Sequence, residues 1–313
     1  MKRSEAILLP AAALASRALP AAAQSSGLDT IRVGVAQDED FAEGLYAADN
    51  GYFRQARLDP QLTTMRGGGP LTEAVISGAL DVATSNTGSM SLAFTKGFPV
   101  ALIFPEAIYS SASTTAAILV LKDSRVRAAR DLNGKRVAVT TLSSLLHTSV
   151  RNWIDLSGGD STSVSYLEIP LPEQVAALQR GRIDAVASVE PWITAAKNET
   201  RILGKPYDSI ADRFMISGWI ATKDWVAKNP DVARRFVNTM RLTAQWANRN
   251  PKATAAILSK SFGIPAATVE AMHRTSMATN LDPKLVQPVI DALAKYKVMP
   301  RSFSAADMMM TIG

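Results

Sequence analysis

The sequence predicts an α/β protein built from two Rossmann-like lobes. After residue 24, short runs of β-branched and other apolar residues alternate with amphipathic stretches, which is the pattern of βαβ units around a mostly parallel sheet. The chain has 313 residues, whereas a single hydrophobic core stops growing near roughly 250 to 300 residues. Hydrophobic residues make up 47% and charged residues 20% of the chain, a composition typical of globular proteins. Two packed lobes are therefore expected.

The stretch that ends near Pro105 predicts the first set of βαβ units. Period-two and buried apolar patterns indicate strands, and helical spacing indicates the helices between them. The predicted strands are 31–36, 58–65, 82–85 and 100–104, and the predicted helices are 41–53, 71–79 and 89–96. Gly51 and Gly97 are expected to end helices, because glycine adopts the left-handed cap conformation without strain.

A second set of units repeats this layout. Its predicted strands are 116–121, 136–140, 165–169 and 184–188, with an extended segment at 201–203, and its predicted helices are 143–156, 172–180 and 190–196. The two sets resemble each other most closely at residues 78–83 (GALDVA) and 181–186 (GRIDAV). In each, a helix ends at glycine, an aspartate follows, and a short apolar strand begins. A further strand at 216–222 leads into helices at 231–248, 252–262, 266–277 and 284–296, which close the chain.

The first residues predict a secretory signal peptide over 1–23. Lys2 and Arg3 precede an Ala/Leu-rich run that reaches the small residues Ala21-Ala22-Ala23. The alternative is an amphipathic first helix, which Pro10 and Pro20 would interrupt. The sequence contains no cysteine, so no lipid-modified cysteine, disulfide or thiolate nucleophile is expected. We find no apolar run of eighteen residues, and hence expect no membrane span.

The charge pattern argues against nucleic acid as a partner. The formal net charge is +6, but no run of five or six basic residues and no stripe of alternating aromatic and basic residues is present. A mild positive field suits a small anionic solute better.

An ordered set of short segments resembles a known protein family. The segments are Gly51-Tyr52-Phe53, Gly67-Gly68-Gly69, residues 78–83, Lys96-Gly97-Phe98-Pro99, residues 131–139, residues 181–185 and Pro191-Trp192, and together they span roughly residues 28 to 250. In these segments the chain resembles the sulfonate-, nitrate- and taurine-binding (NMT1/THI5-like) periplasmic proteins of bacterial ABC importers. That family also includes binders of thiamine-precursor pyrimidines and of aromatic acids.

The resemblance implies a periplasmic binding protein of type II-like architecture. It implies two lobes with a central ligand cleft and two hinge crossings, which we expect near residues 106–115 and 206–215. Residues 24–107 and 213–313, with the C-terminal helices, then form lobe 1, and residues 108–212 form lobe 2. The expected partners are a small-molecule ligand and the membrane permease of the importer, and the expected state is a monomer in the periplasm.

The candidate ligand-binding residues follow from the fold rule for α/β sheets. Ligands bind beyond the carboxyl ends of the strands, where the free N–H groups of helix N-termini attract anions. The residues that we expect at these positions are Gln37, Asp38, Phe41, Arg66, Gly67, Ser85, Asn86, Thr87, Thr140, Thr141, Ser143, Ser144, His147, Glu190 and Trp192. Hydroxyl and amide side chains at helix starts are also ordinary N-caps, a role that is compatible with ligand binding.

The acidic residues after the first strand leave the ligand class open. Asp38, Glu39 and Asp40 would oppose a plain sulfonate if they were desolvated, so an aminosulfonate or a pyrimidine remains an alternative. Enzymes that resemble the same family use a nucleophilic cysteine or an iron centre with histidines. With no cysteine and only His147 and His273, we expect no catalytic residue, no metal site and no cofactor.

Overall fold

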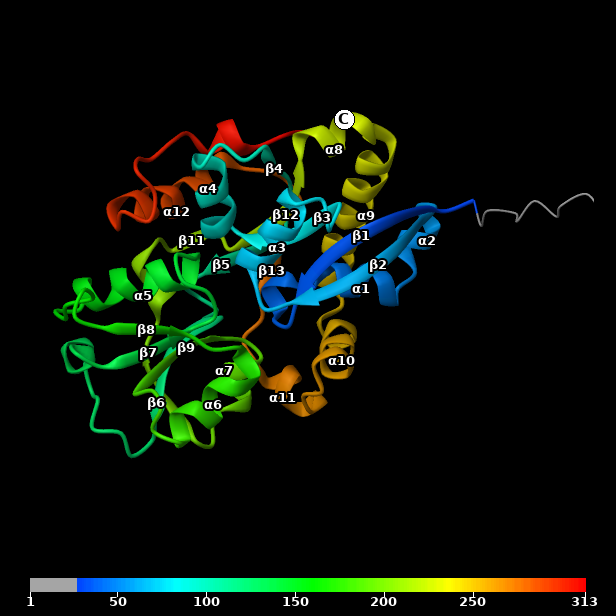
Figure 1. Cartoon of the computed structure of the whole chain (residues 1–313). Coiled ribbons are helices and arrows are strands. Elements are labelled where there is room, and N and C mark those ends of the chain that lie inside the picture. The colour runs from blue at the N-terminus through cyan, green and yellow to red at the C-terminus, as the bar shows by residue number, and fades with distance from the viewer. Residues whose placement is uncertain (1–26) are drawn as a thin grey trace, which may run out of the picture.

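The computed structural model describes residues 27–313, so the predicted signal peptide lies outside the described residues. Two five-stranded sheets form the centres of two lobes (Figure 1). Between residues 27 and 313, no helix combines the length and the apolar content needed to cross a membrane. The α/β fold class with two lobes is therefore confirmed.

The first lobe contains a sheet in the order β2–β1–β3–β12–β4. Its strands are β1 (Asp29–Ala36), β2 (Leu58–Met65), β3 (Val82–Asn86), β4 (Val100–Pro105) and β12 (Ser217–Thr222). Strand β1 pairs in parallel with β2 and β3, whereas β12 is antiparallel to both of its neighbours. Every residue of β3 and β4 is buried, as expected for strands covered by helices on both faces.

The second lobe has a sheet of the same topology in the order β10–β6–β9–β7–β8. Its strands are β6 (Ala116–Leu121), β7 (Arg136–Val139), β8 (Ser165–Glu168), β9 (Ala185–Val189) and β10 (Thr200–Gly204). The three strands β8, β7 and β9 are parallel, and β6 is antiparallel to its neighbours. The repeated layout read from the sequence is thus a repeated sheet topology.

The two related sequence motifs have the same structural role. In the first lobe, Asp81 accepts hydrogen bonds from the main-chain N–H of Arg32 (2.8 Å) and from its guanidinium, which also donates to the Gly78 carbonyl (2.7 Å). In the second lobe, Asp184 accepts from the main-chain N–H of Arg136 (2.9 Å) and from its guanidinium in the same way. Each Gly-x-x-Asp motif therefore connects the end of a helix to a strand of its sheet, β1 in the first lobe and β7 in the second.

The helices that surround the sheets are assigned as follows. The first lobe carries α1 (Glu43–Asp49), α2 (Tyr52–Gln55), α3 (Gly68–Ile76), α4 (Thr87–Thr95), α8 (Lys223–Lys228), α9 (Pro230–Arg249), α10 (Pro251–Phe262), α11 (Ala266–Ala271) and α12 (Pro283–Lys295). The second lobe carries α5 (Leu145–Leu156), α6 (Leu171–Gln179) and α7 (Trp192–Ala195). Short 3-10 turns are η1 (Glu39–Phe41), η2 (Ala129–Leu132), η3 (Pro206–Ser209) and η4 (Ala305–Met308). Helix α11 lies beside α7 of the second lobe (Figure 1).

A small third sheet joins the lobes. It has the order β11–β5–β13 and consists of β5 (Ala107–Ser110), β11 (Arg213–Met215) and β13 (Ser276–Met277), all antiparallel. The predicted crossings at 106–115 and 206–215 contain β5 and β11, which pair with each other. The exact lobe boundaries at 107/108 and 212/213 stay predictions.

Two predicted helices differ from the observed ones. The predicted helix 41–53 is divided into η1, α1 and α2, because Gly51 has a φ of 70° and turns the chain between α1 and α2. The predicted helix 266–277 ends at Ala271. The side chain of Asn248 binds both the N–H and the carbonyl of Met277 (2.9 and 2.8 Å) and holds residues 276–277 as strand β13. Tertiary contacts therefore override the helical spacing there.

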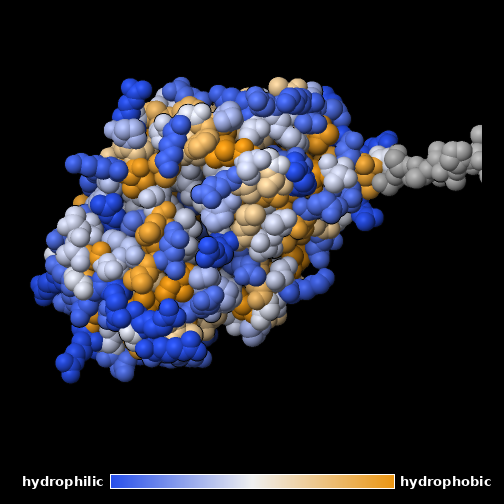
Figure 2. Space-filling view, viewed as in Figure 1, coloured by the Kyte–Doolittle hydropathy of each residue, from blue (hydrophilic) through white to orange (hydrophobic). Residues whose placement is uncertain are grey.

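The surface shown in Figure 2 mixes hydrophilic and hydrophobic residues over both lobes. The exposed large hydrophobic side chains are Phe98, Leu142, Leu156, Leu167, Ile202 and Leu242. Isolated apolar residues of this kind are normal on globular surfaces.

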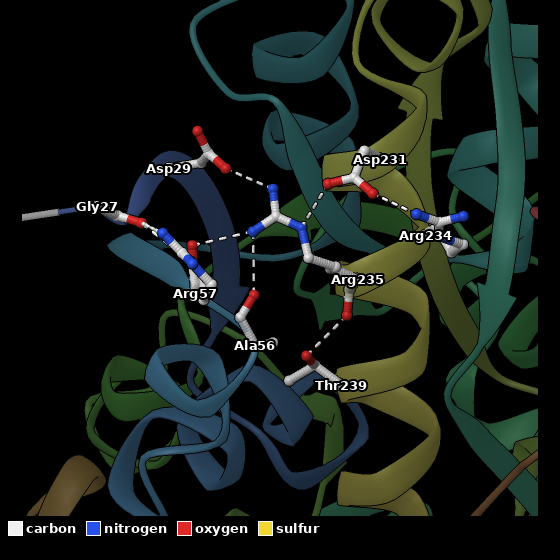
Figure 3. A network of polar contacts seen from close by, with 8 residues as sticks. All are labelled: Gly27, Asp29, Ala56, Arg57, Asp231, Arg234, Arg235 and Thr239. Carbon is white, nitrogen blue, oxygen red and sulfur yellow. Dashed lines mark hydrogen bonds and ion pairs between the residues drawn. The ribbon is translucent and has the colours of Figure 1, made fainter.

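Helix α9 is fastened to the start of the first lobe by Arg235 (Figure 3). Its guanidinium donates to the carbonyls of Ala56 and Arg57 (3.0 Å each) and to Asp231 (2.8 Å), and it also pairs with Asp29. The Arg235 side chain is only 22% exposed. These contacts connect β1, the end of α2 and α9 through one side chain.

Replacing Arg235 with methionine should lower the free energy of unfolding by about 2 kcal/mol, because two main-chain carbonyls lose a charged donor. The neighbouring Arg234 is the matched control. It is 54% exposed and pairs only with Asp231, so Arg234→Met should change stability by less than about 0.5 kcal/mol. Urea unfolding of both variants measures the difference, and equal losses would contradict the role of Arg235.

Candidate ligand-binding site

A narrow cavity of about 30 Å³ lies between the two lobes. Its lining comes from both lobes and from the second crossing: Asp38, Asp40, Phe41, Arg66, Gly67, Gly68, Asn86, Thr140, Ser144, Leu146, Val189, Tyr207 and Ile216. Most of these residues stand at or just beyond the carboxyl ends of β1, β2, β3, β7 and β9, where the fold rule places a ligand. A cavity of this size accommodates little more than a water molecule, so the lobes are closed on each other.

A wider pocket of about 230 Å³ shares Arg66 with the cavity. It is lined by Gln37, Thr64, Met65, Arg66, Pro170, Leu171 and Pro172. The exposed Arg66 side chain therefore stands between the pocket and the closed interlobe cavity. Of the predicted residues, Gln37 lies at this pocket rather than in the cavity.

Helices from the two lobes meet end to end at the cavity. The Asn86 side-chain oxygen accepts from the N–H of Ser89 in α4 (2.8 Å) and from the N–H of Leu145 in α5 (3.2 Å). One side chain of lobe 1 therefore caps a helix of each lobe. Helix α3 begins beside them at Gly68, where a Cβ atom would lie 2.4 Å from the Asn86 amide nitrogen. Three helix N-termini, each with a partial positive charge, converge here.

Glycine at position 88 permits this contact between the lobes. A Cβ atom on Gly88 would lie 2.4 Å from the Leu145 nitrogen and 3.0 Å from its Cα atom. Both are main-chain atoms, which cannot swing aside as a flexible side chain can. Any larger residue at position 88 would therefore hold the lobes apart.

The lobe 2 wall comes from the loop between β7 and α5. Thr140 and Ser144 line the cavity, and the Ser144 hydroxyl caps α5 by accepting from the N–H of His147 (3.3 Å). Thr141 and Ser143 instead line a separate pocket of about 240 Å³ on the other side of the loop. Thr141 still faces lobe 1, because its hydroxyl oxygen would be 3.5 Å from a Cβ atom on Gly67.

Three of the predicted residues are buried beside the cavity and hold neighbouring elements in place. The Ser85 hydroxyl bonds the Thr72 hydroxyl (2.7 Å) and fixes the start of α3. The Thr87 hydroxyl donates to the carbonyl of Met215 (2.6 Å) and ties α4 to the second crossing. His147 accepts from the Ser143 N–H (2.9 Å), and burial lowers its pKa to about 4. None of the three belongs to the lining of the cavity.

Glu190 and Trp192 connect the lobes behind the cavity. The Trp192 indole N–H donates to the Gln37 carbonyl (2.9 Å), across the lobes. Glu190 accepts from the N–H and hydroxyl of Thr194 (3.0 and 2.9 Å) and from the N–H of His273 (3.4 Å). Neither side chain lines the cavity, so their polar groups hold the closed arrangement.

A cluster of buried carboxyl groups lies around and behind Asp38 and Asp40. Glu39 pairs with Arg274 (2.5 Å) and accepts from the N–H of Thr275 (3.0 Å). Glu106 accepts from the Glu43 N–H (3.1 Å) and from the Thr84 hydroxyl. Burial raises the pKa of Glu106 to about 8.

Asp38 and Asp40 line the cavity itself. Burial, followed by the charge of Asp40, raises the pKa of Asp38 well above its usual range, and burial raises that of Asp40 to about 8. One carboxylate oxygen of each has no hydrogen-bond partner among the described residues.

Sequence analysis missed part of the lining. Tyr207 lies in η3 of the second crossing and Ile216 just before β12, and neither carries a motif. Their only signal was their position in or beside a predicted crossing. In the described part of the chain, no three metal-ligating side chains converge.

The chain is similar in sequence to proteins of one family. The family model described as NMT1/THI5 like matches residues 38–254. The taurine-binding periplasmic protein of Escherichia coli K12 is 23% identical over 205 residues, which are 61% of this chain. The match spans only 58% of the length of that relative.

Solved structures share the fold at low sequence identity. The alkanesulfonate-binding protein SsuA of Xanthomonas axonopodis pv. citri, bound to MOPS, superposes with a TM-score of 0.77, 18% identity, and coverage of 92% of this chain and 100% of that one. The desulfurization enzyme DSZB superposes with a TM-score of 0.68, 15% identity, and coverage of 90% and 96%. Both binding proteins and an enzyme therefore use this fold.

Proposed function

The chain belongs to the NMT1/THI5-like family, and from this premise we propose that it is the solute-binding component of an ABC-type importer. It captures a small solute in the interlobe cavity and releases it to a membrane permease when the lobes open. The proposed ligand carries an anionic group, as aliphatic or aromatic sulfonates, taurine, nitrate and related organic acids do. The proposed location is the periplasm, and the proposed state is a monomer.

One observation supports the anionic group above all others. Asn86 caps α4 and α5 with a single oxygen, and α3 starts beside it. Helix N-termini bind oxyanions through free N–H groups and the helix dipole. Because α5 belongs to the other lobe, an anion held here would favour the closed form. Such a differential contact is what a ligand needs to shift a conformational equilibrium.

A pyrimidine or thiamine precursor is the second candidate ligand. Asp38 and Asp40 offer unpartnered carboxylate oxygens in the cavity, which suit the amino group of such a compound as hydrogen-bond acceptors. The cavity holds little more than a water molecule when the lobes are closed, so a ring would require a wider separation of the lobes than a compact ligand does.

The protein is proposed to bind without turnover. An enzyme on this fold that used a thiolate nucleophile would need a cysteine, and the sequence contains none. Incubation of the purified protein with its tightest ligand, followed by mass spectrometry, tests this proposal. Recovery of unchanged ligand is expected, and any catalytic product would contradict the proposal.

Thermal unfolding against a ligand panel tests the function itself. The panel contains alkyl and aryl sulfonates, taurine, nitrate, aromatic carboxylates and aminopyrimidines. A ligand at 100 times its dissociation constant should stabilise the folded protein by about 2.7 kcal/mol, which is a shift of several degrees at this chain length. A flat response across the panel would contradict the proposed function.

Replacing Ser144 with alanine should weaken ligand binding by about 1 to 3 kcal/mol, because Ser144 lines the cavity. The same change removes the cap of α5 and should cost about 1 kcal/mol of stability without unfolding the protein. Titration calorimetry measures the first effect and urea unfolding the second. Unchanged affinity would remove Ser144 from the site.

A further inference from the structure

Two aspartates face the cavity with nothing to neutralise them. Asp38 and Asp40 line it, are 5% and 3% exposed, and each has a carboxylate oxygen without a hydrogen-bond partner among the described residues. A buried carboxylate that is neither paired nor hydrogen-bonded is strongly unfavourable. In the closed arrangement these groups must therefore be protonated or face a positive group.

The acidic neighbours add to this unfavourable charge, and the hydrogen bonds of Asp38 with the Asp40 main chain and of Asp40 with the Thr275 side chain relieve it only in part. The titratable groups that influence Asp38 and Asp40 are Glu39 from η1, Glu106 beside β5, Glu190 beyond β9 and Tyr207 from η3. Arg274 is committed to Glu39, to the Pro251 carbonyl (2.8 Å) and to the Thr254 hydroxyl (2.7 Å). Among the lining residues, Arg66 is the one cation, and its side chain is exposed.

The cavity thus has two walls of opposite polarity. One is formed by the N-termini of α3, α4 and α5, and the other by the two aspartates. A single small anion would satisfy the first wall and leave the second unpaired. We propose that Asp38 and Asp40 form a cation subsite that binds a protonated nitrogen of the ligand, so that the ligand is a compact zwitterion.

This inference rests on the proposed function and narrows its ligand class. The nitrogen is an ammonium or amidinium joined to the anionic group by a short chain, as the small cavity requires. Plain alkanesulfonates and nitrate lack such a group and are poor ligands. Because burial of the two carboxyl groups favours their protonated form, a bound cation displaces protons from the protein into solution.

Isosteric ligand pairs test the subsite by titration calorimetry at pH 7. Taurine and propane-1-sulfonate differ by an ammonium in place of a methyl group, and β-alanine and butyrate form the same comparison for carboxylates. The ammonium member of at least one pair should bind tenfold or more tightly. Repeating its titration in two buffers of different ionisation enthalpy should reveal proton release.

Isosteric variants connect this preference to the two residues. Asp38→Asn and Asp40→Asn should each reduce the preference to threefold or less. Both should keep or raise the melting temperature at pH 8, because each removes a buried, unpaired charge. That result shows that the variants are folded. Asp123→Asn, at an exposed position in a turn of lobe 2, is the control and should leave the preference unchanged.

The possible results separate the two proposals. Equal or tighter binding of the methyl member in both pairs would overturn the cation subsite and leave the solute-binding function standing. An ammonium preference that survives in both variants would also overturn it. Stabilisation by calcium or magnesium chloride alone, lost in Asp38→Asn, would identify a metal instead. No response to any compound of these pairs or of the wider ligand panel would contradict the proposed function as well.

Discussion

The Gly88→Ala variant is expected to lose ligand affinity by at least 100-fold while it remains folded. The added Cβ atom would lie 2.4 Å from the main-chain nitrogen of Leu145, a distance that only separation of the lobes can relieve. Separation breaks the hydrogen bond from the Leu145 N–H to Asn86 and moves the N-terminus of α5 away from those of α3 and α4. Loss of a factor of 100 corresponds to about 2.7 kcal/mol, a plausible value for the loss of one wall of a binding site.

Stability should not follow affinity in this variant. Position 88 lies in the first turn of α4, where alanine is at least as favourable as glycine. The melting temperature of the ligand-free variant should therefore lie within about 2 °C of that of the parent protein. Gly69→Ala is the matched control. Its Cβ atom would meet side-chain atoms alone, a methyl group of Thr141 at 2.9 Å and the Ser89 hydroxyl at 4.0 Å, so it should weaken binding far less. Equal affinity of Gly88→Ala and the parent protein would contradict the closed contact.

The free energy of unfolding should fall as the pH rises from 6.5 to 8. Asp40 and Glu106 have folded-state pKa values raised to about 8, chiefly by burial. A raised carboxyl pKa stabilises the fold below the unfolded pKa near 4, and this contribution is lost as the pH rises through 8. Even one such group should lower stability by about 2 kcal/mol over this interval, because one pKa unit corresponds to about 1.4 kcal/mol.

His147 produces the opposite trend at lower pH. Its folded pKa is lowered to about 4 by burial, so the stability that it contributes is present above pH 6.5 and is lost as the pH falls toward 4. The interval from 6.5 to 8 therefore isolates the carboxyl groups. In Glu106→Gln, urea unfolding at several pH values should show a smaller decline than in the parent. A parent curve that is flat or rising between pH 6.5 and 8 would contradict the buried cluster of carboxyl groups.

Most of the fold was predictable because its signals are local. The buried strands β4 and β6 are continuous apolar runs, and the repeated Gly-x-x-Asp motif marks the same helix-to-strand joint in both lobes. The three-stranded hinge sheet was not predicted. Its strands are two to four residues long and pair across more than 100 positions of sequence, so no periodicity can indicate them.

The site was predictable as a set of loops but not as a set of contacts. Asp38, Phe41, Arg66, Gly67, Asn86, Thr140 and Ser144 were expected and line the cavity. Ser85 and Thr87 follow the same sequence rule, yet their hydroxyls turn inward to Thr72 and Met215. The rule identifies the end of a strand, whereas the direction of each side chain depends on packing partners that are distant in sequence.

Ligand-driven closure of the two lobes is the central claim, and distance measurement between fluorophores tests it most directly. The sequence has no cysteine, so a variant with Thr63→Cys in lobe 1 and Glu173→Cys in lobe 2 takes up fluorophores at these two positions alone. Both positions are exposed, and they lie next to residues Thr64 and Pro172 of the pocket beside Arg66. We predict that saturating ligand shortens the distance, and that Gly88→Ala abolishes the change. An unchanged distance between the empty and the saturated protein would contradict the account.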